Sequence, residues 1–209
     1  MFKTIVTIEV GPEKRPFPVH KELLCSQSDF FAAAFNSTHK FQESIKGVVH
    51  LTEDRPDVFE YFVQWLYTKS LAHEDVDAPI PAYHHLLRLY ALADKLSINA
   101  LKNDIVDRIA VLADEKNVVP APSDTLILYN DIRESAPVRR LVLDLFRFKK
   151  TNQLIQNHED SWDEGFLRDL VVGSKADGKA DGGKPWKKDV CVYHEHRVVP
   201  AHGCKLEEK

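Results

Sequence analysis

The chain has 209 residues, a length that suits one main domain with an appendage. Its content of 44% hydrophobic and 29% charged residues excludes collagen-like, low-complexity and wholly disordered proteins. With a net charge of -4, the chain lacks the broad basic surface that nucleic-acid binding usually needs, so we expect no nucleic-acid partner.

The sequence shows neither a signal peptide nor an uncharged apolar run long enough to span a bilayer, so no membrane association is expected. The three cysteines, Cys25, Cys191 and Cys204, are an odd and sparse set, which argues against a disulfide framework. We therefore expect a protein of the cytoplasm, the nucleus or both.

The amino-terminal part of the sequence predicts an α+β fold. Apolar and polar residues alternate over residues 4–10, as in a half-buried strand. Residues 16–19 predict a second strand, at a sheet edge because its prolines cannot donate to a ladder. Two short helices follow, of which Ser28 is expected to cap the second, and residues 48–51 predict a third strand.

Apolar residues then recur at helical spacing in three stretches, and Pro56 suits the first turn of the first helix. Residues 72–81, between the first two stretches, carry acids and prolines and predict a solvated loop. The three apolar stripes are Val58, Phe59, Phe62, Val63 and Leu66; Leu86, Leu89, Tyr90 and Ala93; and Ile98, Leu101, Ile105, Ile109 and Leu112.

Beyond residue 116 the sequence predicts a helical appendage. Ser123 is expected to cap one helix, residues 138–146 carry the apolar repeat of another, and residues 161–164 form a capping box ahead of a third. Residues 173–184 lack bulky apolar side chains and predict a flexible linker. We therefore expect a main domain over 1–115, a carboxyl-terminal helical extension over 116–172, and a flexible linker and tail over 173–209.

The sequence contains no recognisable catalytic constellation. Neither of the two common glycine-rich phosphate loops occurs. His194 and His196 lie two residues apart, whereas the histidines of the H-E-x-x-H zinc proteases lie four apart. Cys25 follows two leucines on a predicted helix and is expected to be a buried structural residue. We therefore expect a protein that is not an enzyme.

Several motifs in a fixed order resemble those of the BTB/POZ domain. They are HKELLCSQSDFF at 20–31, VVHL at 48–51, DVFEYFVQWLYT at 57–68 and LYALADKL at 89–96. The resemblance covers residues 4–113 and looks most like the compact stand-alone BTB proteins of filamentous fungi. It implies a small mixed sheet packed against a helical cluster, with no catalysis of its own.

The resemblance also implies protein partners. BTB/POZ domains serve self-association and recruitment, and some bind cullin-type ubiquitin-ligase scaffolds through a hydrophobic-x-Glu motif between the second helix and the third strand. Phe41, Gln42 and Glu43 occupy that place, and an aromatic anchor beside a carboxylate suits an interface hot spot. Alternatively, Phe41 belongs to the core and Glu43 is solvated. We expect a cullin-linked adaptor; the alternative is a self-associating scaffold or transcription-linked regulator.

A homodimer is the other association that the resemblance implies. The sequence begins almost at its first predicted strand, so a strand-swapped dimer is not expected. The helix that starts near His20 is the candidate dimer contact, through His20, Leu23 and Leu24.

The carboxyl-terminal segment predicts a zinc site and otherwise no cofactor. Cys191, His194, His196 and Cys204 follow a C-x2-H-x-H-x7-C spacing and offer two thiolates and two imidazoles, enough for a tetrahedral site. The spacing differs from that of a C2H2 zinc finger, and the alternative is an exposed tail without metal. Trp186, in the same segment, is expected to be an exposed contact.

Overall fold

The computed structural model describes residues 3–36, 47–71, 82–149, 151–176 and 183–196. The chain divides into two compact units, Met1–Leu101 (unit 1) and Lys102–Lys209 (unit 2), and the boundary falls inside helix α6 (Asn99–Glu115). The sequence placed it later, near residue 115. Asn103 and Asp107 of α6 bind Glu195 and His194 of the carboxyl-terminal segment, contacts that no local sequence pattern indicates.

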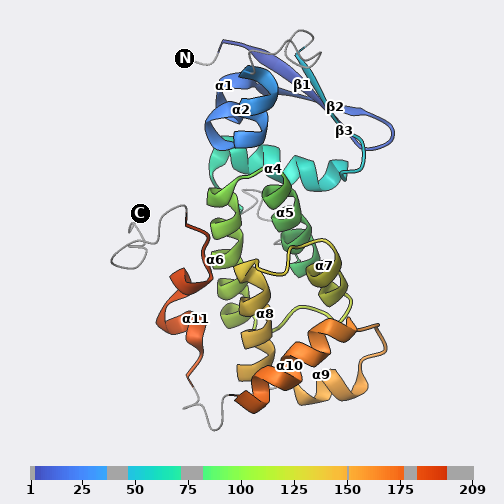
Figure 1. Ribbon diagram of the computed structural model, residues 1–209, viewed down its shortest axis with the longest axis vertical. Coiled ribbons are helices and arrows are strands. Elements are labelled where there is room, and N and C mark those ends of the chain that lie inside the picture. Colours follow the sequence, from blue (N-terminus) through green and yellow to red (C-terminus); the bar gives the residue numbers. More distant parts are fainter. Residues whose placement is uncertain (1–2, 37–46, 72–81, 150, 177–182, 197–209) are drawn as a thin grey trace. The chain divides into compact units, whose positions relative to one another are not determined.

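In the described part of unit 1, three short strands form one sheet in the order β2-β1-β3 (Figure 1). β1 (Ile5–Val10) pairs antiparallel with β2 (Arg15–His20) and parallel with β3 (Val48–Leu51). The two prolines lie in the edge strand β2, as the sequence predicts, because an edge strand leaves one row of amide positions unpaired. A parallel pair requires a crossover, and the helices between β2 and β3 lie in that connection.

The helices of unit 1 supply most of its core. They are α1 (Lys21–Gln27), α2 (Asp29–Asn36), α4 (Pro56–Thr68), α5 (Tyr83–Lys95) and the first residues of α6. The predicted stripes are confirmed by burial: Phe59, Phe62, Leu86 and Tyr90 are fully inaccessible to solvent. The fold class is therefore α+β, as predicted, whereas the expected loop over 72–81 lies outside the described residues.

Ser28 joins two distant segments of unit 1. Its hydroxyl accepts a hydrogen bond from the Phe31 amide at 3.2 Å, which confirms the predicted cap of α2, and donates to the Leu96 carbonyl at 2.6 Å. The side chain is 1% exposed, so water cannot replace either bond. One hydroxyl thus fixes the start of α2 against the end of α5.

Unit 2 is helical in its described residues and contains, besides α6, the elements α7 (Asp124–Asn130), α8 (Pro137–Phe148), α9 (Asn152–Asn157), α10 (Glu164–Ala176), α11 (Pro185–Lys188) and the 3-10 turn η1 (Val190–Tyr193). The apolar repeat predicted over 138–146 is buried in α8. α10 packs against α7 and α8. No helix among the described residues has both the length and the apolar character needed to cross a bilayer.

Two predicted capping bonds in unit 2 are wrong, although α7 begins directly after Ser123 as predicted. The Ser123 side chain makes no capping bond, and its hydroxyl donates instead to Asp160 at 3.2 Å. The capping residue of α10 is Asp163 and not Ser161, because the Asp163 carboxylate accepts from the amide of Phe166 at 3.0 Å. A carboxylate is a strong acceptor for the amide groups that a helix start leaves unpaired.

The prediction of a flexible segment over 173–209 is wrong for the residues that the structure describes. α10 continues to Ala176, and residues 183–196 fold into α11 and η1. Trp186, expected to be exposed, is only 4% exposed, and Tyr193 is fully buried. These two aromatic side chains bury apolar surface, which the composition of the segment did not predict.

We predict that Ser28→Ala destabilises the protein by about 1–3 kcal/mol, because it removes one cap and one buried hydrogen bond. Urea denaturation followed by circular dichroism measures the change. Ser26→Ala is the matched control, since Ser26 is exposed and donates only to the Leu23 carbonyl within its own helix. A Ser28→Ala loss no larger than that of the control would contradict the role of Ser28.

Candidate functional site

The start of α1 presents a partly exposed surface, which we call the α1 surface and define as His20, Leu23 and Tyr67. The His20 amide donates to the Tyr67 hydroxyl at 3.2 Å, and the His20 Nδ1 lies 2.8 Å from the same oxygen. Tyr67, near the end of α4, is 47% exposed, and Leu23 is partly exposed. The tyrosine hydroxyl thus orients the imidazole ring at the edge of this surface.

Leu24 does not belong to the α1 surface, although the sequence suggested it as a dimer contact. Its side chain is fully buried. The short helix α1 packs against α2, β2 and α4, and its one fully inward position is Leu24. A dimer contact of this helix therefore has His20 and Leu23 available but not Leu24.

The predicted partner-binding residues Phe41, Gln42 and Glu43 lie outside the described residues. In the sequence they fall between α2, which ends at Asn36, and β3, which begins at Val48. That is the position expected of the hydrophobic-x-Glu motif, and their contacts stay a prediction.

The carboxyl-terminal segment, residues 183–196, is tied to unit 2 by a buried carboxylate. The Tyr193 hydroxyl donates to Asp144 at 2.6 Å, and Arg147 contacts the other oxygen of the same carboxylate at 3.1 Å. Burial raises the pKa of Tyr193, and the hydrogen bond to Asp144 raises it further. The phenol is therefore held in its neutral, donating form.

Glu195 supplies a second anchor for this segment. Its carboxylate lies 2.7 Å from the Lys102 ammonium and also contacts the Arg133 guanidinium. Its backbone amide donates to the Asn103 side-chain oxygen at 2.8 Å, and its carbonyl accepts from the Asn103 side-chain nitrogen at 3.1 Å. The Lys102 side chain is only 4% exposed, so the ion pair is shielded from solvent.

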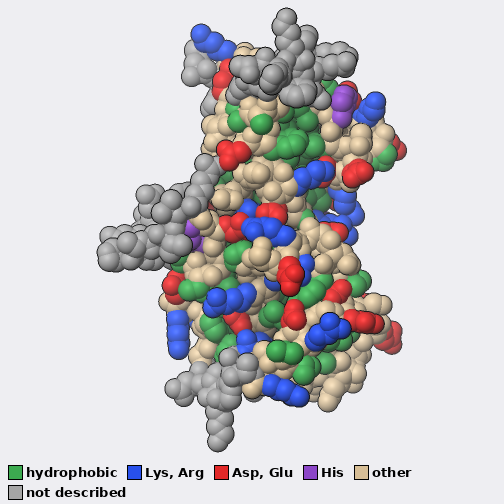
Figure 2. Space-filling model, viewed as in Figure 1, with side chains coloured by type: hydrophobic (Ala, Val, Ile, Leu, Met, Phe, Trp, Pro, Cys, Tyr) green, Lys and Arg blue, Asp and Glu red, His purple; other side chains and the backbone are tan. Residues whose placement is uncertain are grey.

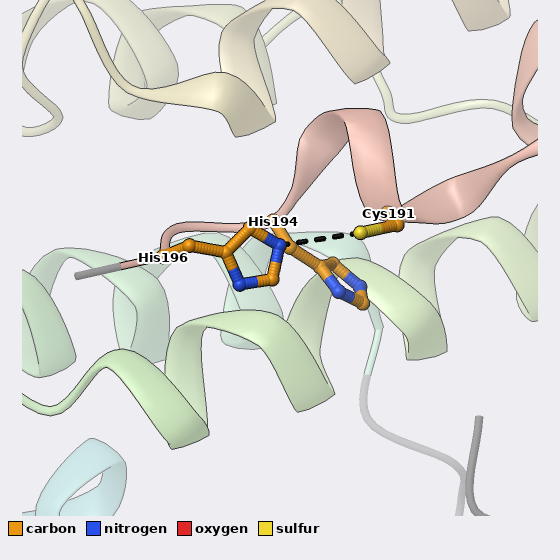
Figure 3. A group of neighbouring side chains, drawn as sticks. All are labelled: Cys191, His194 and His196. Carbon is orange, nitrogen blue, oxygen red and sulfur yellow. Dashed lines mark hydrogen bonds between the residues drawn. The ribbon is translucent and has the colours of Figure 1, made fainter. Parts of the chain in front are cut away.

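Between these anchors, three predicted metal ligands come together (Figure 3). One ligand atom from each of Cys191, His194 and His196 lies within 4.8 Å of the others, and all three residues are half-buried. Cys204, the predicted fourth ligand, lies outside the described residues. The cluster sits on η1 and the residues that follow it.

Sequence reasoning missed the residues that hold this cluster. His194 Nε2 lies 2.8 Å from the Asp107 carboxylate, and Glu195 binds Lys102 and Asn103. All three partners lie on α6, roughly ninety residues earlier in the chain. Their polar spacing on a helix resembles that of any solvated face, so a local pattern gave no signal for them.

Cationic and anionic side chains are interspersed over the face shown in Figure 2. Several basic side chains of unit 2 donate hydrogen bonds to backbone carbonyls within the unit. Arg139 donates to the Tyr129 carbonyl at 3.0 Å, Arg147 donates to the Gly173 carbonyl at 2.9 Å, and Lys149 donates to the Ala113 carbonyl. These cations stabilise contacts between helices.

A comparison with protein-family models identifies the class. The family model of the BTB/POZ domain matches residues 4–109, which is half of the chain and includes all four motifs. The chain therefore belongs to the BTB/POZ domain family, and the mixed sheet and helices of unit 1 agree with that fold. BTB/POZ domains mediate protein–protein interactions and oligomerisation, and they form a family of interaction modules rather than of enzymes.

We predict that Tyr193→Phe lowers the free energy of unfolding by about 1–3 kcal/mol, because the buried Asp144 loses a donor. Tyr129→Phe is the matched control: Tyr129 donates to Asp169, which is exposed and is solvated by water when the phenol is removed. Urea denaturation of the two variants measures the difference, and equal losses would contradict the role of the Asp144 bond.

The same pair predicts a pH dependence. Because the pKa of Tyr193 is raised in the folded chain, the unfolded chain loses its phenolic proton first as the pH rises above about 10. The stability that Tyr193 confers is thus complete below about pH 10 and is lost at higher pH. The stability difference between wild type and Tyr193→Phe should narrow as the pH is raised from 9 to 11, within the range in which the protein refolds reversibly; a constant difference would contradict this.

Proposed function

We propose that this protein is a non-enzymatic adaptor that links partners to a cullin-type ubiquitin ligase. The observation that carries the proposal is the BTB/POZ match over residues 4–109. Cullin binding is one of the uses of this family, and the chain has a candidate motif at the place where cullin-binding members carry theirs. A helical extension follows, as in such members.

The candidate motif has the chemistry of a small binding hot spot. Phe41 supplies an apolar ring that can fill a groove, and Glu43 supplies a carboxylate for a basic or amide group on the partner. Both residues precede β3, the strand that pairs with the central strand β1.

The helical extension supports the proposal by its folded character. α10 packs on α7 and α8, and the ring of Phe166 contacts Phe146 and Tyr129 edge to face. Helices with their own aromatic core keep a fixed surface, and preorganisation lowers the entropic cost of binding. In cullin-binding members a paired-helix extension widens the contact with the cullin.

We predict that the purified full chain binds the amino-terminal domain of a cullin from the same organism with micromolar or tighter affinity, and that Phe41→Glu abolishes the binding heat. Isothermal titration calorimetry measures both. A charge at the apolar anchor leaves the groove unfilled and buries an unpaired carboxylate.

Ile5→Glu is the matched control, since Ile5 is apolar and 64% exposed in the same unit but lies away from the motif in the sequence. The proposal requires that Ile5→Glu binds as wild type does. Absence of heat with folded wild type for every cullin of the organism, or equal loss in both variants, would contradict it.

Self-association is the second candidate function, favoured by the partly exposed Leu23 and Tyr67 on the α1 surface. If this surface forms a dimer contact, light scattering coupled to gel filtration should give twice the chain mass at tens of micromolar, roughly the range of weak specific contacts. Leu23→Glu should restore the monomer, whereas Phe41→Glu should not. A monomeric wild type at this concentration would contradict the dimer.

A further inference from the structure

The strongest candidate for a second site is the half-buried cluster of Cys191, His194 and His196. We propose that these three side chains bind a zinc ion, which holds residues 191–196 in their folded form where His194 contacts Asp107 of α6. The proposal is independent of cullin binding. It follows from the ligand atoms, from the residue that orients one of them and from the way the segment is anchored.

The ligand atoms are spaced nearly as zinc requires. With zinc bonds of about 2.3 Å to sulfur and 2.0–2.1 Å to nitrogen, tetrahedral geometry places neighbouring ligand atoms about 3.3 to 3.6 Å apart. The Cys191 sulfur lies 3.2 Å from His196 Nε2, and all three ligand atoms are within 4.8 Å of one another. Side-chain shifts of about 1 Å complete the geometry. Figure 3 shows the Cys191 sulfur hydrogen-bonded to the His196 ring, with the His194 ring beside this pair.

Asp107 orients one ligand in the manner typical of zinc sites. His194 Nε2 lies 2.8 Å from the Asp107 carboxylate. An ionised carboxylate can only accept, so Nε2 carries the proton and Nδ1 keeps its lone pair for a metal. Metal-binding histidines usually donate their second ring N–H to such a carboxylate, which fixes the tautomer and increases the basicity of the ligand.

The segment that carries the ligands is held on both sides of His194. Tyr193 binds the buried Asp144, and Glu195 binds Lys102 and Asn103 on α6. Because Tyr193 and Glu195 directly flank His194, the backbone at this ligand is fixed before any metal arrives. Preorganisation of this kind lowers the entropic cost of binding an ion.

The donor set selects the ion. One thiolate and two imidazoles suit zinc, whereas magnesium and calcium require oxygen ligands. Three protein ligands leave one tetrahedral position.

The competing explanation is a metal-free pair in which the Cys191 thiol and the His196 ring share a proton. It accounts for the 3.2 Å contact. The metal-free pair does not explain why a His194 ring nitrogen lies near it or why His194 binds Asp107. A thiolate in such a pair would be reactive, whereas a thiolate bound to zinc is protected from alkylation.

The test uses the full chain without an affinity tag, purified without added metal. Inductively coupled plasma mass spectrometry should find about one zinc per chain. After the metal is removed with a chelator, the chain is titrated with zinc in competition with a chromophoric indicator, and thermal unfolding is recorded with and without zinc. The bound ion should raise the unfolding temperature, because it binds only the folded segment.

The variants separate ligands from bystanders. Cys191→Ser and His196→Gln should each weaken zinc binding by more than about 100-fold, and Asp107→Asn by about 10- to 100-fold, because Asp107 acts through His194. Cys25→Ser and His158→Gln are the matched controls, one cysteine and one histidine outside the cluster, and should bind zinc as wild type does. Circular dichroism confirms that each variant is folded.

Cobalt substitution gives a second readout that does not depend on stability. Cobalt bound in tetrahedral geometry to a thiolate shows sulfur-to-metal charge transfer in the near ultraviolet and intense visible bands. These bands should be lost in Cys191→Ser. Bands that survive Cys191→Ser and disappear only in Cys204→Ser would overturn the assignment of Cys191.

Two further outcomes would overturn the proposal. The first is wild-type protein that contains no zinc and whose zinc affinity does not exceed that of Cys191→Ser. The second is rapid alkylation of Cys191 by iodoacetamide that added zinc does not slow, which would identify the metal-free thiol–imidazole pair. Zinc-dependent protection of Cys191, together with unchanged binding in the two control variants, would support the proposal.

Discussion

The need to pair buried polar groups joins distant segments of the chain in both units. In unit 1 the Ser28 hydroxyl connects the start of α2 with the end of α5, and in unit 2 the Asp144 carboxylate holds Tyr193 against α8. A buried hydroxyl left unpaired costs about 1–3 kcal/mol, and a buried carboxylate costs more. Apolar burial drives the collapse of both units, but these bonds decide which segments meet. The positions of α2 and of the carboxyl-terminal segment within their units depend on them.

An interaction module needs a surface whose parts are held in fixed positions. Unit 1 carries out its role by presenting side chains, so its core has only to keep the sheet and α1 in place. Leu24 belongs to that core, while His20, Leu23 and Tyr67 remain at the surface. The division within one short helix follows from its packing against α2, β2 and α4. A surface fixed in this way binds without first having to become ordered.

The carboxyl-terminal segment shows how a short polar sequence becomes ordered. Residues 183–196 contain few apolar side chains, yet Trp186 and Tyr193 are buried, and Glu195 forms an ion pair with Lys102. A segment of this length cannot fold by itself, because its burial does not offset the loss of chain entropy. It is ordered only where α6 and α8 supply its partners. A bound zinc ion would add a further link within residues 191–196, as zinc does in other small structural segments.

The sequence by itself determined the class of the fold, the edge position of β2, the helices α4, α5, α6 and α8, and the family, because these depend on local periodicity, on the chemistry of proline and on ordered motifs. It also found Cys191, His194 and His196, whose spacing is local. Only the tertiary structure decided that Leu24 and Trp186 are buried, that Asp163 caps α10, and that Asp107 orients His194. The physical reason is distance along the chain: burial and pairing depend on residues many positions away, which no local pattern can specify.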